Sequence, residues 1–199
     1  MNSMEPIRLQ STDALVVVDV QNDFLPGGAL AVPRGDEVIP VLNRYLALFE
    51  RKQLPVIATR DWHPPNHNSF NEQGGIWPAH CVRDTPGASF ASNLKLPDKA
   101  IIVSKATTAR QEAYSGFEGT GLAQRLRDLG VRRVFVGGLA TDYCVLNTVL
   151  DALKNGFETL LLLDACRAVN VKPDDGITAE KKMLQAGARP VMLEQLAAE

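Results

Sequence analysis

Short apolar runs of strand length alternate along this chain with longer amphipathic stretches, and this alternation constrains the fold more than any other feature. Six runs rich in β-branched and apolar residues predict strands at 14–18, 55–59, 100–104, 133–136, 159–163 and 190–193. Four stretches with apolar residues at helical spacing predict helices at 36–52, 121–129, 142–155 and 177–186. Such alternation predicts an α/β fold, with a mostly parallel sheet flanked by helices.

The length of the chain and the even spread of these elements predict one domain over residues 1–199. Of the 199 residues, 45% are hydrophobic and 22% charged, which is the ordinary range for a globular domain with a sizeable core. No internal repeat or change of composition marks a domain boundary. Residues 60–99, rich in Pro, Gly, Asn and His, predict a long loop, and loops of that length inside a domain usually carry function.

Charge, apolar runs and cysteine count exclude several classes of partner. The formal net charge is −2 with both signs spread along the chain, so there is no basic stripe for nucleic acid. The first ten residues lack the apolar core of a signal peptide, and the apolar runs are too short to cross a membrane. Three cysteines are an odd number, which favours free thiols in a reducing compartment. We therefore expect a cytoplasmic protein that binds neither nucleic acid nor membrane.

Polar and nucleophilic side chains stand at the ends of four predicted strands. Asp19 ends the first strand, Asp61 the second and Lys105 the third, while Cys144 opens the helix after the fourth. In open α/β sheets, ligands bind beyond the carboxyl ends of the strands. We therefore expect these four residues to converge on one side of the sheet.

Cys144 has the setting of an activated nucleophile. Thr141 is the predicted N-cap of its helix and Gly156 the stop, which places Cys144 in the first turn. The free amides and dipole of that turn, together with a nearby lysine, favour the thiolate. Asp19 could take the thiol proton and later pass it to a leaving amine, while Lys105 holds both anionic groups. Such a trio suits amide hydrolysis.

Each of these three residues alone has a more ordinary explanation. A cysteine in a helix is usually a small core residue. Asp19 could be a turn residue, and Lys105 could be a solvated surface residue. Only the convergence of all three at strand ends makes catalysis a competitive interpretation.

The histidines of the chain predict a metal site, because all three lie in one window of the long loop. Asp61 and His63 are two residues apart at a strand end, so both side chains can point the same way. With His80 they form a mixed set of nitrogen and oxygen ligands suited to Zn, Fe or Mn. We therefore expect one bound divalent metal ion.

The other histidine and the other cysteines allow several interpretations. His67 could be a further ligand, could support a ligand, or could simply be exposed. The two prolines between His63 and His67 exclude a helix that carries both on one face. Cys81 adjoins a ligand and is expected to be structural, and Cys166 is expected to be a buried core thiol.

The same segments resemble the isochorismatase-like cysteine hydrolases, and within them the nicotinamidases. The segments that carry the resemblance, in the family's order, are VVVDVQNDFLPGGALAV around Asp19, TRDWHPPNHNSF around Asp61 and His63, WPAHC at His80, SKAT at Lys105, EAYSGFEGTGL, and GGLATDYCV at Cys144. They cover the chain from residue 14 to about residue 193. The fold implied is one α/β domain with a sheet in the order 3-2-1-4-5-6, whose reversal lies between strands 1 and 4.

The resemblance implies a role for each residue of the reaction centre. Asp19, Lys105 and Cys144 would form the catalytic triad. A cis peptide between Leu139 and Ala140 would precede the nucleophile turn, and the amides of Ala140 and Cys144 would form the oxyanion hole.

The resemblance also implies which groups hold the substrate. The metal ligands would be Asp61, His63 and His80, with His67 a ligand in some members only. The substrate pocket would be lined by Phe24, Trp77, Tyr114 and Leu139, although the aromatic residues could equally be core residues. The metal would hold a pyridine nitrogen and so place a carboxamide beside the cysteine.

The implied activity is the hydrolysis of nicotinamide to nicotinate and ammonia, by a chain that could form a homo-oligomer. Other hydrolases of the superfamily are alternatives: they cleave a vinyl ether without a metal, or carbamoyl amides without this histidine cluster. The set of Asp61, His63 and His80 argues against both. A non-catalytic relative that keeps the fold and the metal is a further alternative, against which the intact triad argues.

Overall fold

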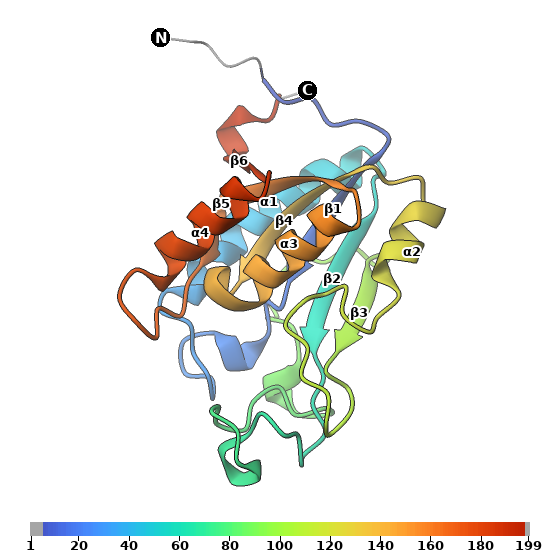
Figure 1. Ribbon diagram of the computed structural model, residues 1–199. Coiled ribbons are helices and arrows are strands. Elements are labelled where there is room, and N and C mark those ends of the chain that lie inside the picture. Colours follow the sequence, from blue (N-terminus) through green and yellow to red (C-terminus); the bar gives the residue numbers. More distant parts are fainter. Residues whose placement is uncertain (1–5, 198–199) are drawn as a thin grey trace.

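A six-stranded sheet forms the centre of the computed structural model, which describes residues 6–197 (Figure 1). The strands are β1 (Asp13–Val18), β2 (Val56–Asp61), β3 (Ile101–Lys105), β4 (Arg133–Leu139), β5 (Glu158–Arg167) and β6 (Arg189–Val191). Their order is β3-β2-β1-β4-β5-β6, and every neighbouring pair is parallel. The predicted strands and sheet order are confirmed. Residues 1–5 and 198–199 lie outside the described residues. The predicted domain includes both segments, and the prediction that the first ten residues are no signal peptide falls partly on residues 1–5.

Residues 6–197 contain four α-helices, which cover both faces of the sheet (Figure 1). They are α1 (Val38–Arg51), α2 (Leu122–Asp128), α3 (Leu146–Lys154) and α4 (Asp175–Gln185). The side chains of β1 alternate between two core clusters: Leu15 and Val17 pack with α1, whereas Val16 packs with the other three helices. Each strand of the centre is therefore buried on both faces, as parallel sheets require.

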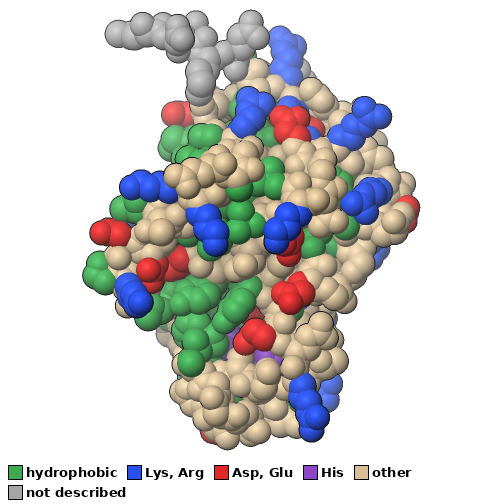
Figure 2. Space-filling view, in the orientation of Figure 1, with side chains coloured by type: hydrophobic (Ala, Val, Ile, Leu, Met, Phe, Trp, Pro, Cys, Tyr) green, Lys and Arg blue, Asp and Glu red, His purple; other side chains and the backbone are tan. Residues whose placement is uncertain are grey.

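Surface charge and helix length can be compared with the predictions about nucleic acid and membranes. On the face shown in Figure 2, Lys and Arg side chains are interspersed with Asp and Glu. Among residues 6–197, no helix is both long enough and apolar enough to cross a membrane.

The connection between β2 and β3 extends beyond the carboxyl ends of these strands (Figure 1). It contains only short 3-10 turns, Asn71–Gln73 and Pro86–Ala88, which confirms the predicted loop. The strand β2 extends through Asp61, so residues 60 and 61 belong to the sheet rather than to the loop. Buried residues of the loop, among them Cys81 and Leu94, join the core cluster on the α1 side and anchor the loop there.

The turn that carries Cys144 is a π-helical turn, Thr141–Val145, which runs directly into α3. Cys144 thus lies in the first turn, as predicted. The prediction of Thr141 as N-cap is wrong, because the wider turn moves the cap to Ala140, whose carbonyl accepts two N–H bonds at 3.1 Å. The predicted stop is confirmed: Gly156 has a φ of +85° and its N–H donates to the carbonyl of Leu153 at 3.0 Å.

The end of β4 lies very close to the end of β1. Gly138, paired with Val18, has a φ of +129°, and a Cβ added there would lie 2.1 Å from the Val18 carbonyl oxygen. Only glycine allows this approach. The next peptide bond, Leu139–Ala140, is cis, as the resemblance implied. The turn that carries Cys144 therefore begins beside the residue that follows β1, which is Asp19.

Candidate active site

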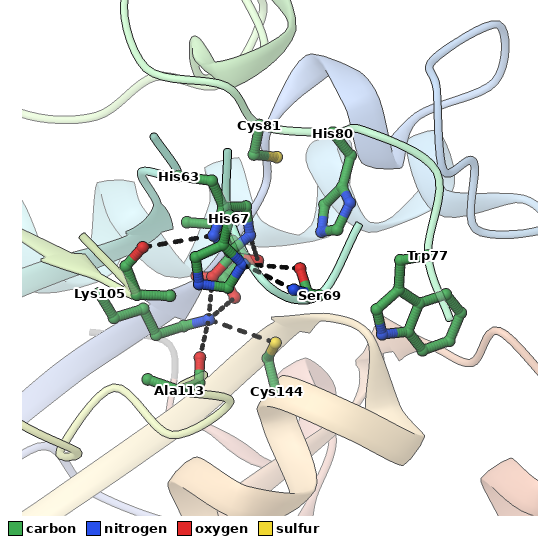
Figure 3. Close-up of polar contacts among 12 residues, drawn as sticks. His63, His67, Ser69, Trp77, His80, Cys81, Lys105, Ala113 and Cys144 are labelled. Atoms are coloured by element: carbon green, nitrogen blue, oxygen red, sulfur yellow. Dashed lines mark hydrogen bonds and ion pairs between the residues drawn. The ribbon is translucent and has the colours of Figure 1, made fainter. Parts of the chain in front are cut away.

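Asp19, Lys105 and Cys144 meet at the carboxyl end of the sheet, and all three are buried. Lys105 Nζ lies 3.4 Å from Cys144 Sγ and donates to the carbonyl of Ala113 at 3.2 Å (Figure 3). The same Nζ lies 2.9 Å from Asp19 Oδ2, as an ion pair without hydrogen-bond geometry. The three residues come from β1, β3 and the turn after β4, so the convergence predicted from strand ends is observed.

Asp19 is held at the point where β1 leaves the sheet. Its φ of +48° turns the chain, while its N–H still donates to the carbonyl of Thr59 in β2 at 3.2 Å. The hydroxyl of Thr59 donates to Asp19 Oδ1 at 2.6 Å. Sequence analysis missed Thr59; its signal is the register of β2, in which Thr59 pairs with Val18, the residue before Asp19.

Two carboxylates share Lys105, and their pKa values shift in opposite directions. Burial raises the pKa of Asp19, and the neighbouring Asp61 adds to this rise; Lys105 and Thr59 lower the pKa without cancelling the rise. Burial alone would also raise the pKa of Asp61, but Lys105, which donates to Asp61 Oδ1, and His63 hold it below its ordinary value. Asp61 therefore stays ionised, and Asp19 is the carboxyl that can carry a proton.

The thiol of Cys144 is protonated at rest. Burial raises the pKa of Cys144 well above its ordinary value; Lys105 opposes this rise by a smaller amount, and Asp19 and Asp61 add to it. Lys105 lowers this pKa, as expected from the sequence, but burial and the two carboxylates outweigh it, so the net shift favours the thiol and not the expected thiolate. A base must therefore remove the thiol proton, and Asp19, which has a carboxylate oxygen within 4.8 Å of the Cys144 sulfur, is placed to do so.

Asp61, His63 and His80 form a compact set of candidate metal ligands, with ligand atoms within 4.8 Å of one another. His63 Nδ1 lies 3.3 Å from the Ala106 carbonyl, and His80 Nδ1 lies 2.8 Å from the Pro78 carbonyl. These contacts fix both rings and leave each Nε2 for another partner. Among residues 6–197, the buried His63 Nε2 has no hydrogen-bond partner, as expected of a nitrogen that coordinates a metal ion.

The burial and charge of this cluster also suit a metal. Burial lowers the pKa of His80, which keeps the ring neutral, and a histidine must be neutral to bind a cation. Asp61, ionised, supplies a negative charge. Only small parts of the histidine side chains are visible at the surface in Figure 2. The residues therefore fit a divalent metal ion with nitrogen and oxygen ligands.

His67 lies next to this cluster without joining it. Its ring stacks on that of His63 with centroids 4.2 Å apart. Its Nδ1 lies 2.7 Å from Ser69 Oγ and its Nε2 lies 3.1 Å from the carbonyl of Gln111 (Figure 3). Both ring nitrogens are thus engaged, which favours the interpretation that His67 supports His63 over the interpretation that it is a ligand.

Aromatic rings form a wall beside Cys144. Trp77 Nε1 donates to the hydroxyl of Tyr114 at 3.1 Å. Tyr143, which directly precedes Cys144, packs on both, with centroid distances of 5.2 Å to Trp77 and 5.6 Å to Tyr114. The structure brings the two predicted pocket residues together and adds Tyr143, which sequence analysis missed. Its position next to the nucleophile was the available signal.

Of the other two predicted pocket residues, Phe24 lies beside the metal cluster and Leu139 lies in the core. The ring of Phe24 is 5.7 Å from that of His80, and Leu139 is fully buried in the same core cluster as Phe24. Phe70, which sequence analysis missed, packs its ring 5.5 Å from both His63 and His80. An aromatic residue within a loop gives no signal of such a role.

The remaining cysteines are buried free thiols, as expected. Cys81 supports the site through its backbone: its N–H donates to Asp23 Oδ2 at 2.7 Å, and its carbonyl accepts the N–H of His63 at 3.0 Å. Cys166 lies in β5 opposite Gly138. These contacts agree with a structural role for both thiols.

Comparisons with known proteins match this arrangement. The Isochorismatase domain family model matches residues 13–195. The nicotinamidase of Escherichia coli (strain K12) is 40% identical over 196 residues, which cover 88% of this chain and 92% of that protein. The crystal structure of the pyrazinamidase of Pyrococcus horikoshii in complex with zinc is 54% identical with a TM-score of 0.88, and the match covers 92% of this chain and 99% of that one.

A second solved structure extends the likeness to nearly the whole chain. The crystal structure of PnC1 from L. infantum in complex with nicotinate is 36% identical with a TM-score of 0.90, and the match covers 98% of this chain and 100% of that one. Sheet order, the residues at the strand ends and these matches agree. The chain belongs to the isochorismatase family.

Proposed function

We propose that this protein is an amidohydrolase that converts nicotinamide to nicotinate and ammonia, with Cys144 as its nucleophile. The observation that carries the proposal is a buried thiol that lies 3.4 Å from Lys105 Nζ and within 4.8 Å of the Asp19 and Asp61 carboxylates, of which Asp61 also belongs to the cluster with His63 and His80. Relatives support the choice of substrate: one is a nicotinamidase, and one structure was solved with nicotinate.

In the first half of the reaction, Asp19 takes the proton of the Cys144 thiol. The sulfur then bonds to the carboxamide carbon, and the carbonyl electrons move to its oxygen. The backbone amides of Ala140 and Cys144 would hold this oxyanion. When the carbonyl re-forms, the carbon–nitrogen bond breaks, and Asp19 gives its proton to the departing nitrogen. Ammonia leaves, and a thioester remains on the sulfur.

In the second half, water replaces ammonia at the same position. Asp19 takes a proton from the water as its oxygen bonds to the thioester carbon. The carbon–sulfur bond then breaks, the thiol of Cys144 regains the proton, and nicotinate is released. Lys105 keeps its place throughout, because its charge balances Asp19 and Asp61 and offsets the negative charge on the sulfur.

Asp61, His63 and His80 would hold one divalent metal ion, which could be Zn, Fe or Mn. When bound, the ion supplies a Lewis acid for the pyridine nitrogen of the substrate. The chain's own residues set the geometry around it: His67 and Phe70 pack against His63 and fix its ring. The rings of the aromatic wall would then lie along the substrate and keep water away.

We further propose a cytoplasmic location, because all three cysteines are free thiols and a reducing compartment preserves them. The homo-oligomer stays a prediction that a measurement of molecular mass in solution would test.

The test of the proposed function is ammonia release by the metal-loaded protein from nicotinamide and from benzamide, which has the carboxamide but no ring nitrogen. We expect steady release from nicotinamide and little from benzamide, because only nicotinamide can use both halves of the site. No release from nicotinamide would refute the proposal. Equal turnover of the two amides would refute the role of the ring nitrogen.

A further inference from the structure

Gln21 is a fully buried side chain that takes no part in the triad or in the metal cluster. Its carboxamide makes three hydrogen bonds, each with a backbone atom. The Nε2 group donates to the carbonyls of Asp61 at 2.8 Å and Ala88 at 2.9 Å, and Oε1 accepts the N–H of Asp61 at 2.8 Å. Gln21 therefore binds both backbone groups of a single residue, and that residue is a candidate metal ligand.

The hydrogen bonds between Gln21 and Asp61 take the place of backbone bonds that β1 would make to β2 if it were longer. The pairing of β1 with β2 ends at Val18 and Thr59, because Asp19 turns the chain out of the sheet with its φ of +48°. The strand β2 continues two residues further, to Asp61. A carboxamide has one donor side and one acceptor side, so the side chain of Gln21 can satisfy both backbone groups of Asp61, which a longer β1 would otherwise bond.

The orientation of Asp61 matters both to Lys105 of the triad and to the metal cluster. On the other side of β2 it pairs in register with Lys105, and its Oδ1 accepts from the Lys105 ammonium. Its Oδ2 faces the cluster, 3.6 Å from His63 Nε2. A backbone that could rotate at Asp61 would move both oxygens, because the residue is the last of its strand.

We propose that Gln21 is a positioning residue for the metal site, which acts by fixing the backbone of Asp61 where β1 no longer can. The inference rests on the metal site proposed above. Its consequence is that loss of the Gln21 carboxamide weakens metal binding, although Gln21 itself touches no metal. Partners that orient a metal ligand typically contribute about 10- to 100-fold in metal affinity.

The chain offers a matched control at the next residue. Asn22 Nδ2 donates to the carbonyl of Pro86 at 2.8 Å, so it ties together the same two segments that Gln21 joins through Ala88. Asn22 is exposed, and its bond goes to the loop rather than to Asp61. A role of Gln21 in loop attachment would be shared by Asn22, whereas a role through Asp61 would not.

The experiment compares the zinc dissociation constants of the wild type, Gln21→Met and Asn22→Ala, by competition with a chromophoric chelator. Methionine keeps the length and the unbranched shape of glutamine without its hydrogen bonds. We expect Gln21→Met to bind zinc about 10- to 100-fold more weakly. Asn22→Ala should stay within about twofold of the wild type, as exposed substitutions usually do.

Thermal unfolding separates positioning from general stability. Zinc raises the Tm of a protein that binds it only when folded, by an amount set by affinity. We expect Gln21→Met to show a smaller zinc-induced rise than the wild type at the same zinc concentration, whatever its Tm without zinc. Should Gln21→Met fail to fold, Gln21→Glu replaces it: this variant keeps the acceptor for the Asp61 N–H but turns a carboxylate toward two carbonyls, and the same loss of affinity is expected.

Three results would overturn the inference. The first is zinc affinity in Gln21→Met equal to that of the wild type, even with a lowered Tm, which would make Gln21 merely structural. The second is an equal loss of affinity in Asn22→Ala, which would place the effect in the loop. The third is a wild type without zinc affinity, which the wild-type measurement alone reveals and which would remove the proposed metal site as well.

Discussion

A buried aspartate with a basic partner lies at each end of β1, and the two pairs differ in how their charges are matched. At the amino end, Asp13 begins β1 and Arg133 begins β4, and the guanidinium donates to both carboxylate oxygens at 2.7 and 2.6 Å. At the carboxyl end, Asp19 follows β1 and meets Lys105, which comes from β3 and also contacts the thiol of Cys144 after β4.

The difference lies in how completely the charges are matched. Arg133 serves one carboxylate, and its Nη2 also donates to the carbonyl of Arg8 at 2.9 Å, so the charges of the amino-end pair are matched one to one. Lys105 serves two carboxylates and a thiol at once, and the neighbouring His63 Nε2 has no partner among residues 6–197. A matched pair contributes to stability, whereas an unmatched one can exchange protons and bind ligands. The four predictions that follow test this contrast.

The largest expected effect is the loss of turnover in Cys144→Ala. Cys166 provides the matched control, because it is as buried as Cys144 and lies in β5, away from Lys105. We expect Cys144→Ala to reduce kcat for nicotinamide by more than about 10⁴-fold, because it removes the nucleophile. Cys166→Ala should keep its kcat. Retention of a tenth of the wild-type rate by Cys144→Ala would rule out the covalent mechanism.

The two ends of β1 should separate activity from stability when each aspartate is changed to asparagine. Asp19→Asn cannot shuttle a proton, so kcat should fall about 10³-fold. Its Tm should not fall, because the raised pKa of Asp19 means that folding disfavours the ionised carboxylate, which the amide removes.

Asp13→Asn should do the reverse. It leaves the charge of Arg133 without its partner, and breaking a buried ion pair costs about 3 kcal/mol, or a fall in Tm of about 6–12 °C for a chain of this size. Below the melting range kcat should be unchanged. Circular dichroism melts give the Tm of both variants, and ammonia assays give their kcat. Equal losses of kcat in Asp19→Asn and Asp13→Asn would contradict the proposed difference between the two ends of β1.

Removal of the metal should lower kcat/KM for nicotinamide by about 100-fold, because the substrate loses its orientation. Readdition of Zn, Mn or Fe should restore it. The metal-free protein should still be alkylated at Cys144 by a small thiol reagent, because Lys105 and Asp19 stay in place. His63→Ala and His80→Ala should reproduce the metal-free state, and His67→Ala should lose less, since both of its ring nitrogens are already engaged. Full turnover by protein shown to be metal-free would contradict this role.

The smallest expected effect is a displaced acid limb in the pH profile. Burial raises the pKa of Asp19 above its ordinary value of 3.8. Asp19 must be ionised to accept the thiol proton, so kcat/KM should be full above this raised pKa and should fall as the pH drops through it. Asp13→Asn should keep the same limb. A limb at or below the ordinary aspartate range, in protein shown to be folded by circular dichroism, would show that Asp19 is not the base.

The strands and the convergence of Asp19, Asp61, Lys105 and Cys144 are predictable because they follow from general geometry. Apolar runs mark the strands of a parallel sheet, and the carboxyl ends of those strands meet at one edge. The order of the strands and the cis peptide before Ala140 do not follow from any local pattern, and only the resemblance to a family implied them.

The parts that sequence reasoning missed depend on burial or on contacts between distant segments. The pKa of Cys144 rises because the thiol is buried between two carboxylates, and spacing along the chain shows neither fact. Gln21 and Asp61 are 40 residues apart, and their contact exists only because β1 ends earlier than β2. The local N-cap rule fails at Thr141 because a π-turn over Thr141–Val145 shifts the start of the helix and moves the cap to Ala140.

The most direct test of the central claim is to locate the acyl group during turnover. Metal-loaded protein mixed with excess nicotinamide is quenched with acid, digested and analysed by mass spectrometry, beside Asp13→Asn and Cys144→Ala. We expect a nicotinoyl group on Cys144 in the wild type and in Asp13→Asn, and none in Cys144→Ala. A nicotinoyl group on Cys81 or Cys166, or steady release of ammonia by Cys144→Ala, would contradict hydrolysis through a thioester at Cys144.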